Sequence, residues 1–399
     1  MKNILIIGDG IIGMLSAIVL SSIYQNVYLI RRTERQKYPH KIDRFFSINL
    51  LTKYFFIKHG IWKDIIASKA KPYNKIITWD DKIENDLIFE SSSISYDSLG
   101  YIVREASIIN SLLSRLSKIK NIISINDEDI KSIHDNKNTC EVILYKSKSI
   151  SLDLVLKSDK SMDSLLSSGE FKTKIVDYKQ HAFVVDLFFK ENSTQTIAYQ
   201  KFSQGQIMGL LPISKNQYNL IWSVNDNILD DIKNHTDVKI LSILNSHLSE
   251  KIGNIESISN RIIFPLSGFH TESYIINQTL AIGGAAHSVH PMAGLGLNMG
   301  IQDIFLLENY FLQMHMDDHN PIKVLEKFNK CCISENTKTY NTINFLKRFY
   351  SDKSFPDFFR SQSLKIFSKN NYLKNKVIES ATGLDILKRK LVGKYCYPN

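Results

Sequence analysis

The chain has 399 residues, of which 43% are hydrophobic and 11% aromatic, and its formal net charge is +10. This length and composition exclude a mainly disordered protein and allow two or three domains with a large core. No uninterrupted apolar segment reaches about 18 residues, so we expect no membrane-spanning helix.

The first predicted elements are a strand, a glycine turn and a helix. The run Asn3 to Ile7 is mostly apolar, Gly8-Asp9-Gly10-Ile11-Ile12-Gly13 follows, and Met14 to Leu20 is compatible with a helix. In such a pattern Gly8 permits the tight turn, Gly10 lets the backbone approach a pyrophosphate, and Gly13 lets the helix pack on the strand. The sequence therefore predicts a dinucleotide site. A secretory signal peptide is the alternative, and Asp9 and the three glycines disfavour it.

The following elements complete a βαβ opening and then change character. A second parallel strand is predicted over residues 26–30. The remaining predicted elements are a helix at 45–70, a hairpin at 75–95, a helix at 105–117, strands at 141–146 and 152–157, a hairpin at 197–202 and 207–211, and helices at 300–316 and 321–345.

The densest cluster of small residues lies between Leu280 and Asp303. It predicts a strand, a small-residue turn, a Gly294-Leu295-Gly296 bend and a helix that starts near Leu297-Asn298. This geometry brings bare backbone and a helix N-terminus against a planar or anionic group. Two such sites, one near each end of the chain, suit a long ligand such as FAD.

This second cluster carries a family resemblance. It reads GGAAHSVHPMAGLGLNMGIQD and is similar to GNAAHxxHPxAGQGFNLGxRD of the flavoprotein aromatic hydroxylases, in particular the ubiquinone-biosynthesis branch that hydroxylates polyprenylated phenols. The segments IDRFFSINLLTKYFFIKHGIW, LGYIVREASIINSLLSRL and AYQKFSQGQIMGLLPIS are also similar to family segments. The resemblance covers nearly the whole chain.

The resemblance implies an α/β fold with a Rossmann-like FAD-binding domain, an inserted β-rich substrate domain and a helical C-terminus. The expected boundaries are 1–74, 96–177 and 262–330 for the FAD-binding domain, 75–95 and 178–261 for the substrate domain, and 331–399 for the C-terminal helical region.

Site residues are carried over position by position. Gly8, Gly10 and Gly13 would hold the adenosine diphosphate half of FAD, Arg44 would lie near the flavin and pyrophosphate, and Asp159 matches the acid of a central Asp-Gly motif. The set that matches the stretch beside the ribityl chain and the isoalloxazine ring is Gly284, Gly294, Leu295, Gly296, Leu297 and Asn298.

The implied reaction is hydroxylation. NAD(P)H, a transient reductant, reduces FAD, and one oxygen atom of O2 is then transferred to an activated phenol ring. Because the flavin carries this chemistry, we assign no catalytic side chain. We also expect no metal, since no third ligand accompanies His287 and His290.

Three positions depart from the family pattern. Arg31 stands where an acidic residue normally contacts the adenosine ribose, Lys160 stands where the central motif has glycine, and Gly284 replaces an Asp or Asn. These departures motivate one alternative, a catalytically silent scaffold subunit of a ubiquinone-biosynthesis complex. A second alternative is a hydroxylase of a soluble aromatic compound, which a small polar pocket lined with arginines would favour.

The C-terminal region is strongly basic, with twelve Lys/Arg and four Asp/Glu over residues 347–394. Aromatic residues alternate with these charges, which suits an anionic membrane surface, while a solvated basic face is the plain alternative. No nucleic-acid motif accompanies the charge. We expect a cytoplasmic protein, peripheral on the inner face of a bacterial membrane, with other ubiquinone-biosynthesis proteins as partners.

Overall fold

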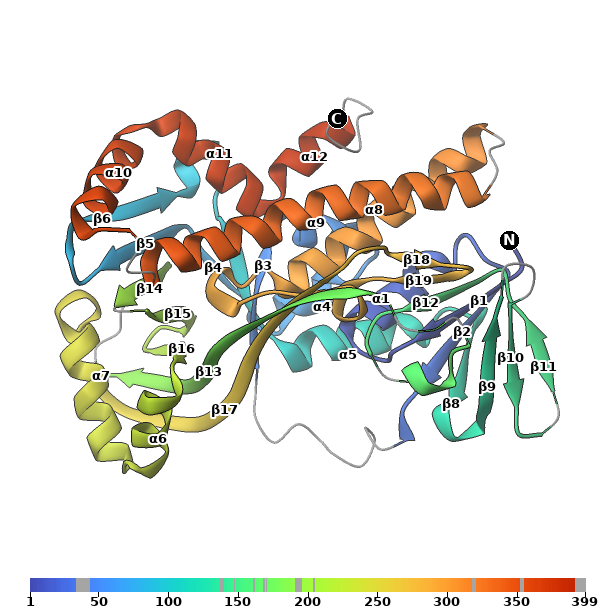
Figure 1. The fold of residues 1–399 in the computed structure, drawn as a ribbon, viewed down its shortest axis with the longest axis horizontal. Helices are drawn as coiled ribbons and strands as arrows, with labels where there is room; N and C mark the ends of the chain where they lie inside the picture. The colour runs from blue at the N-terminus through green and yellow to red at the C-terminus, as the bar shows by residue number, and fades with distance from the viewer. Residues whose placement is uncertain are drawn as a thin grey trace.

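The structure is a computed structural model with a mixed α/β fold (Figure 1). It describes residues 1–33, 44–136, 140–146, 148–160, 162–167, 169, 171–190, 196–203, 205–317, 321–351 and 355–391.

The first large sheet contains the predicted N-terminal unit. Its six strands lie in the order β18-β19-β12-β1-β2-β8, and every neighbouring pair is parallel except β18 with β19. The strands are β1 (Asn3–Ile7), β2 (Asn26–Arg31), β8 (Ile122–Asn126), β12 (Leu154–Lys157), β18 (Ile275–Ile276) and β19 (Thr279–Ala281).

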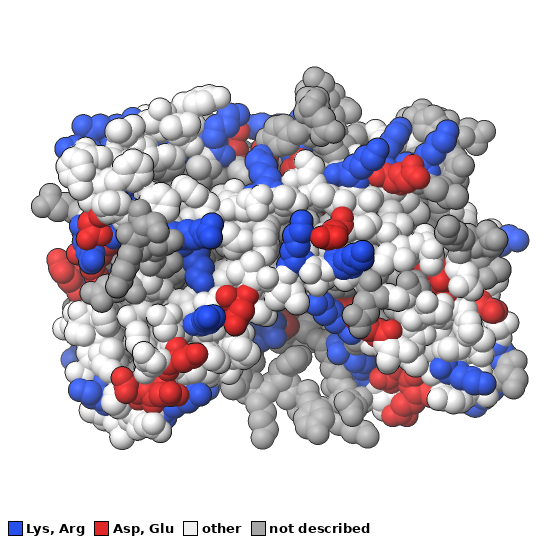
Figure 2. Space-filling view, viewed as in Figure 1, with Lys and Arg blue, Asp and Glu red and all other residues white. Residues whose placement is uncertain are grey.

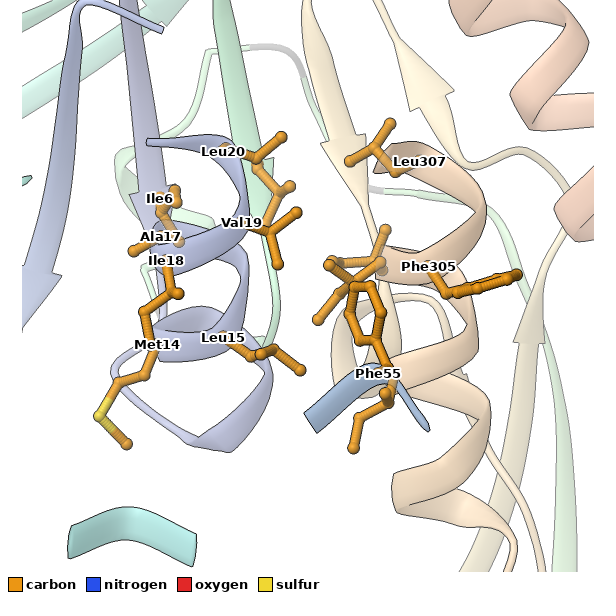
Figure 3. Close-up of a cluster of buried hydrophobic side chains, with 14 of the residues drawn as sticks. Ile6, Met14, Leu15, Ala17, Ile18, Val19, Leu20, Phe55, Phe305 and Leu307 are labelled. Atoms are coloured by element: carbon orange, nitrogen blue, oxygen red, sulfur yellow. The ribbon is translucent and has the colours of Figure 1, made fainter. Parts of the chain in front are cut away.

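Helix α1 (Ile11–Leu20) lies inside the protein, between this sheet and helix α8 (Gly296–Asp317). Nine of its ten residues are buried, as expected for a helix that is apolar on all sides. Figure 3 shows Leu15 and Val19 directed toward Phe55 and α8, while Ile6 of β1 lies on the opposite side of α1. This packing holds the beginning of α1 in place.

The second large sheet has eight strands in the order β20-β17-β13-β16-β15-β14-β5-β6, and its one parallel pair is β14 with β5. The strands are β5 (Lys75–Asp80), β6 (Ile83–Glu90), β13 (Thr173–Phe189), β14 (Ile197–Ser203), β15 (Gln206–Ser214), β16 (Gln217–Val224), β17 (Ile255–Thr271) and β20 (His287–Ser288).

Two three-stranded sheets flank the large ones. They are β3 (Phe45–Asn49), β7 (Gly100–Arg104) and β4 (Lys71–Tyr73), and β11 (Ser149–Ser151), β10 (Cys140–Leu144) and β9 (Ile130–Asp135). The other helices are α3 (Leu50–Lys58), α4 (Trp62–Ala67), α5 (Glu105–Leu116), α6 (Asp226–Asn234), α7 (Asp237–Ile252), α9 (Pro321–Ser351), α10 (Asp357–Lys369), α11 (Asn371–Thr382) and α12 (Leu384–Leu391).

One local prediction was wrong, and two helices were missed. Residues 45–49 form strand β3, not the start of a helix, because they pair with β7; α3 begins only at Leu50, where the side chain of Asn49 accepts a hydrogen bond from Thr52 N. Helices α6 and α7 were not predicted. Helix α7 covers the second sheet with Ile240, Leu244 and Leu248, all fully buried.

The expected domain division stays a proposal. Strands β5 and β6 do lie in the same sheet as β13–β17, although more than 80 residues separate them along the chain (Figure 1). However, β13 begins at Thr173 and β17 continues to Thr271, so both strands extend beyond the expected boundaries at 177 and 262.

The fold class itself is confirmed, including the helical C-terminal region. Among the described residues, none of the helices combines the length and the apolar character needed to cross a bilayer.

Candidate active site

The predicted glycine turn lies at the carboxyl edge of the first sheet. Strand β1 has β2 on one side and β12 on the other, so this edge is a topological switch point, where ligands bind in open α/β sheets. A Cβ added at Gly8 would lie 2.8 Å from Asp159 Oδ2, and one at Gly284 would lie 3.3 Å from the carbonyl oxygen of Ser158. The structure therefore brings Gly8, Asp159 and Gly284 together from three strands.

Two of the glycines are required by local geometry. Gly8 has φ +111°, and a Cβ there would lie 2.3 Å from Ser158 Oγ. A Cβ at Gly13 would lie 1.7 Å from the carbonyl oxygen of Gly8, which no side chain can tolerate. Helix α1 thus begins pressed against the end of β1.

The N-terminus of α1 is open to an anion. Gly10 is its N-cap, no side chain caps it, and its first turn contains no acidic residue. The first amides of a helix have no partner within the helix, and the helix dipole favours negative charge there. This end of the helix can therefore accept a phosphate group of a bound dinucleotide.

Arg32 occupies the same edge, and the sequence did not single it out. Its Nε lies 3.3 Å from Asp9 Oδ1 and its Nη2 lies 3.3 Å from Asp159 Oδ2, so one guanidinium bridges two carboxylates. Arg31, the residue that departs from the family pattern, ends β2 immediately before it. The basic pair Arg31-Arg32 thus places one arginine at the strand end and one across the glycine turn.

The second predicted bend is also built on glycines. Gly294 has φ +61°, and its would-be Cβ lies 3.2 Å from Ser47 Cβ, whereas no atom lies within 4 Å of a Cβ at Gly296. The flanking leucines separate: Leu295 packs against a cluster near the second sheet and Leu297 against the main core. The bend therefore combines an anchored side with bare, open backbone, which fits a planar group.

Asn298 holds this bend to the rest of the protein. Its Oδ1 accepts hydrogen bonds from Asn49 N (3.0 Å) and Thr52 Oγ1 (2.9 Å), and its Nδ2 donates to the carbonyl oxygens of Ser47 (2.7 Å) and Gly294 (3.1 Å). All four hydrogen-bonding positions of the amide are thus used within the protein. The side chain of Asn298 positions the bend and has no capacity left for a ligand.

Arg44, a predicted site residue, and Lys160, a departure from the family pattern, have contacts of their own. Arg44 Nε lies 3.2 Å from Glu105 Oε2, and the guanidinium lies over the Phe46 ring at 5.5 Å. Lys160, at the glycine position of the central motif, places its Nζ 3.6 Å from the centre of the Phe269 ring in β17. The Lys160 side chain is thus held against the second sheet.

A buried polar network beneath the second glycine cluster was missed by the sequence reasoning. Asp303 is fully buried and accepts hydrogen bonds from Gly283 N (2.9 Å), His287 (2.7 Å) and Asn336 Nδ2 (2.7 Å). Asn336, from α9, also donates to Tyr274 Oη at 2.7 Å. The network joins the turn after β19 to helices α8 and α9.

His290 fixes the next turn. It is fully buried, and its Nδ1 accepts a hydrogen bond from Met292 N at 3.2 Å. Its ring meets the Tyr178 ring edge-on, with centroids 5.0 Å apart. Burial, together with the charge of Lys347, lowers the pKa of His290 to about 3.

This depressed pKa predicts a pH dependence of stability. The unfolded chain protonates His290 near its ordinary pKa of about 6.5, while the folded protein resists protonation down to about pH 3. The stability that neutral His290 contributes is therefore fully present above about pH 6.5 and is lost as the pH falls toward 3. Urea unfolding at pH 7.5, 6.0 and 5.0 should show falling stability, and His290→Gln should reduce this dependence. The remaining part belongs to groups such as His270, whose pKa burial lowers to about 4. An unchanged slope in the variant would contradict the assignment.

The chain is similar in sequence to known proteins. A family model described as FAD binding domain matches residues 166–331, which include the bend but not the N-terminal glycine turn. The chain is 25% identical to "Ubiquinone biosynthesis monooxygenase COQ6, mitochondrial" of Dictyostelium discoideum, over 97% of this chain and 92% of that protein. It is 22% identical to "Ubiquinone hydroxylase UbiM" of Neisseria meningitidis, over 89% of this chain and 78% of that one.

Solved structures share the fold. The p-nitrophenol 4-monooxygenase PnpA of Pseudomonas putida superposes with a TM-score of 0.71 at 12% identity, over 96% of this chain and 99% of that one. PqsL of P. aeruginosa, solved with 2-aminobenzoylacetate, superposes with a TM-score of 0.72 at 15% identity, over 92% and 100%.

The family match and the sequence relatives support an FAD-dependent oxidoreductase. The resemblance to the flavoprotein aromatic hydroxylases, and within them to the ubiquinone-biosynthesis hydroxylases, is confirmed by these relatives.

Proposed function

We propose that the protein is an FAD-dependent monooxygenase that hydroxylates a polyprenylated phenol ring in ubiquinone biosynthesis, using NAD(P)H and O2. The observation that carries the proposal is the meeting of Gly8, Asp159 and Gly284 at one sheet edge in a chain whose relatives are named as ubiquinone hydroxylases. Bound FAD would supply the redox chemistry. The chain's own residues bind, orient and exclude water.

The proposed division of labour follows the geometry. Gly8, Gly10 and Gly13 would receive the pyrophosphate at the start of α1. Asp159 and Gly284 would border the ribityl chain. Five residues would hold the flavin ring through their backbone: Gly294, Leu295, Gly296, Leu297 and Asn298. Arg44 would contact the pyrophosphate only if its ion pair with Glu105 were broken.

An apolar cluster beside the bend supports a prenylated substrate over a soluble aromatic acid. Met292 packs there with Ile83 and Leu87 of β6, and Leu295 lies at its edge. Arg360 is the buried arginine beside this cluster, and its Nη1 lies 3.2 Å from Asp80 Oδ2, so its charge is already paired. The described side chains of this cluster beside the bend are thus apolar.

The experiment compares two phenols in the presence of ¹⁸O2. The FAD-loaded protein is given NADH or NADPH and either a prenylated phenol in detergent or the same phenol without its prenyl chain. We expect one ¹⁸O atom in the prenylated product. Faster hydroxylation of the unprenylated phenol would favour a soluble substrate, and bound FAD without any turnover would favour a silent scaffold subunit.

We predict that Arg32→Ala weakens FAD binding by roughly tenfold without changing stability. Without Arg32, the carboxylates of Asp9 and Asp159 would repel the incoming diphosphate, whereas partly exposed ion pairs contribute only about 0–1 kcal/mol to folding. Flavin fluorescence titration and thermal unfolding measure the two effects. Lys75→Ala, which removes an exposed pair with Glu90 in the second sheet, is the matched control. Unchanged FAD affinity in Arg32→Ala would contradict the prediction.

We also propose that the protein works at the cytoplasmic face of a bacterial membrane, beside other ubiquinone-biosynthesis proteins. A polyprenylated phenol partitions into a bilayer, and the excess of basic residues after position 347 suits anionic lipid.

A further inference from the structure

Helices α10 and α11 have apolar side chains on both of their faces. The inner face of α10 buries Arg360 and Leu364, and that of α11 buries Ile378 and Thr382. Phe358 of α10 is nevertheless 75% exposed, and Tyr372 of α11 is 69% exposed. Seven large apolar side chains at the end of α9 and on these two helices are exposed: Phe345, Phe358, Phe359, Ile366, Tyr372, Leu373 and Val377.

Apart from Asp357, the exposed residues of α10, which include the uncharged Gln362, form one stripe. At 100° per residue, Phe358, Phe359, Lys365, Ile366 and Lys369 fall within about 120° of the helix circumference, opposite the buried face. In the same way Tyr372, Leu373, Lys376 and Val377 fall within about 140° of α11, opposite Ile378. We call these two stripes, with Phe345, the outer face.

The charges of the outer face have one sign. Its ionic residues are Lys365, Lys369 and Lys376, and none is acidic. Asp357 and Glu379, the acidic residues of the two helices, are each held in ion pairs: Asp357 with Lys82 at 3.2 Å, and Glu379 with Lys388 at 2.8 Å. In Figure 2 the upper left of the molecule, where α10 lies, is mainly white with blue atoms of Lys or Arg.

The outer face is fixed to the substrate side of the protein. Arg360 forms an ion pair with Asp80 at the end of β5, and Leu364 packs into the same apolar cluster as Met292, next to the Gly294-Leu295-Gly296 bend. Figure 1 shows α10 beside β5 and β6. Helix α10 therefore contacts the apolar cluster beside the bend with one face and the solvent with the other.

We propose that the outer face of α10 and α11 is a docking surface for an anionic lipid bilayer, which would bring the substrate side of the protein to the bilayer that holds the prenylated substrate. This inference rests on the proposed function for the identity of the prenylated substrate. Apolar side chains interspersed with lysines match acyl chains beneath anionic headgroups. A second copy of the chain is a poor match, because two lysine-bearing faces would repel each other.

Vesicle flotation of the FAD-loaded full chain tests the surface. Vesicles of phosphatidylglycerol and phosphatidylcholine (about 30:70) are compared with vesicles of phosphatidylcholine alone. We expect binding to the anionic vesicles only, weakened by salt. Phe358→Ser with Ile366→Ser, and separately Lys365→Glu with Lys369→Glu, should each reduce binding by roughly tenfold or more. Val238→Ser is the control, because Val238 is 78% exposed on α7, outside the outer face.

Several results would overturn the proposal. These are wild-type protein that stays unbound, variants that bind as well as wild type, and self-association of the wild type that the variants abolish. Detergent-dispersed prenylphenol separates this test from that of the proposed function: the variants should retain turnover in detergent. If the wild-type protein binds the anionic vesicles but does not turn over the prenylphenol, the result counts against the proposed function and not against the docking surface.

Discussion

Gly13→Ala is expected to abolish FAD retention and to lower the free energy of unfolding by roughly 3 kcal/mol. The added Cβ would lie 1.7 Å from the carbonyl oxygen of Gly8, so α1 has to move away from β1. The same shift displaces the open amides at the start of α1 from the phosphate position. FAD content after desalting and urea unfolding measure the two effects.

Gly209→Ala is the matched control for this variant. Gly209 lies in β15 of the second sheet, and the nearest atom to its would-be Cβ is 3.9 Å away, which is ordinary contact. It should keep both FAD and stability. A Gly13→Ala protein that retains flavin as well as this control does would contradict the close packing of α1 on the glycine turn.

Asp303→Ala is expected to destabilise the protein by about 3–5 kcal/mol, because it removes one partner of a buried polar network. Gly283 N, His287 and Asn336 Nδ2 would each lose an acceptor while remaining buried. Gly283 immediately precedes Gly284, so the loss should also weaken FAD binding. Chemical unfolding with and without FAD measures both consequences.

An exposed histidine–aspartate pair provides the comparison. His181 Nδ1 lies 3.1 Å from Asp226 Oδ1, and the Asp226 side chain is 68% exposed. Asp226→Ala should therefore change stability by no more than about 1 kcal/mol. If Asp303→Ala and Asp226→Ala lower the free energy of unfolding by similar amounts, the buried network does not stabilise the protein more than an exposed pair does.

The sequence predicted well those elements whose signals are local. The apolar run before Gly8 became β1, and the hairpin predicted at 197–202 and 207–211 appears as β14 and β15, with somewhat longer strands. The prediction of a helix at residues 45–49 was wrong because a short apolar run is compatible with either a helix or a strand. Pairing with β7 makes it a strand. Helix α7 had a readable signal, since Ile240, Leu244 and Leu248 recur every four residues within a region read as β-rich.

The candidate site likewise has parts that local sequence signals predict and parts that they do not. Glycine spacing pointed to the turn and the bend, because tight turns impose residue types at fixed positions. It could not show that Asn298 binds Ser47 and Asn49, which are about 250 residues away, or that Asp303 joins α8 to α9. Arg32 was missed because the two carboxylates that it bridges come from different strands. Such partners are set by the tertiary fold alone.

The most direct test of the central claim is the absorbance spectrum of the purified wild-type protein between about 350 and 500 nm, after incubation with excess FAD and desalting. We expect a retained flavin spectrum close to one FAD per chain, despite Arg31, Lys160 and Gly284. A folded protein that remains colourless would contradict FAD-dependent hydroxylation and would leave the scaffold alternative as the better explanation.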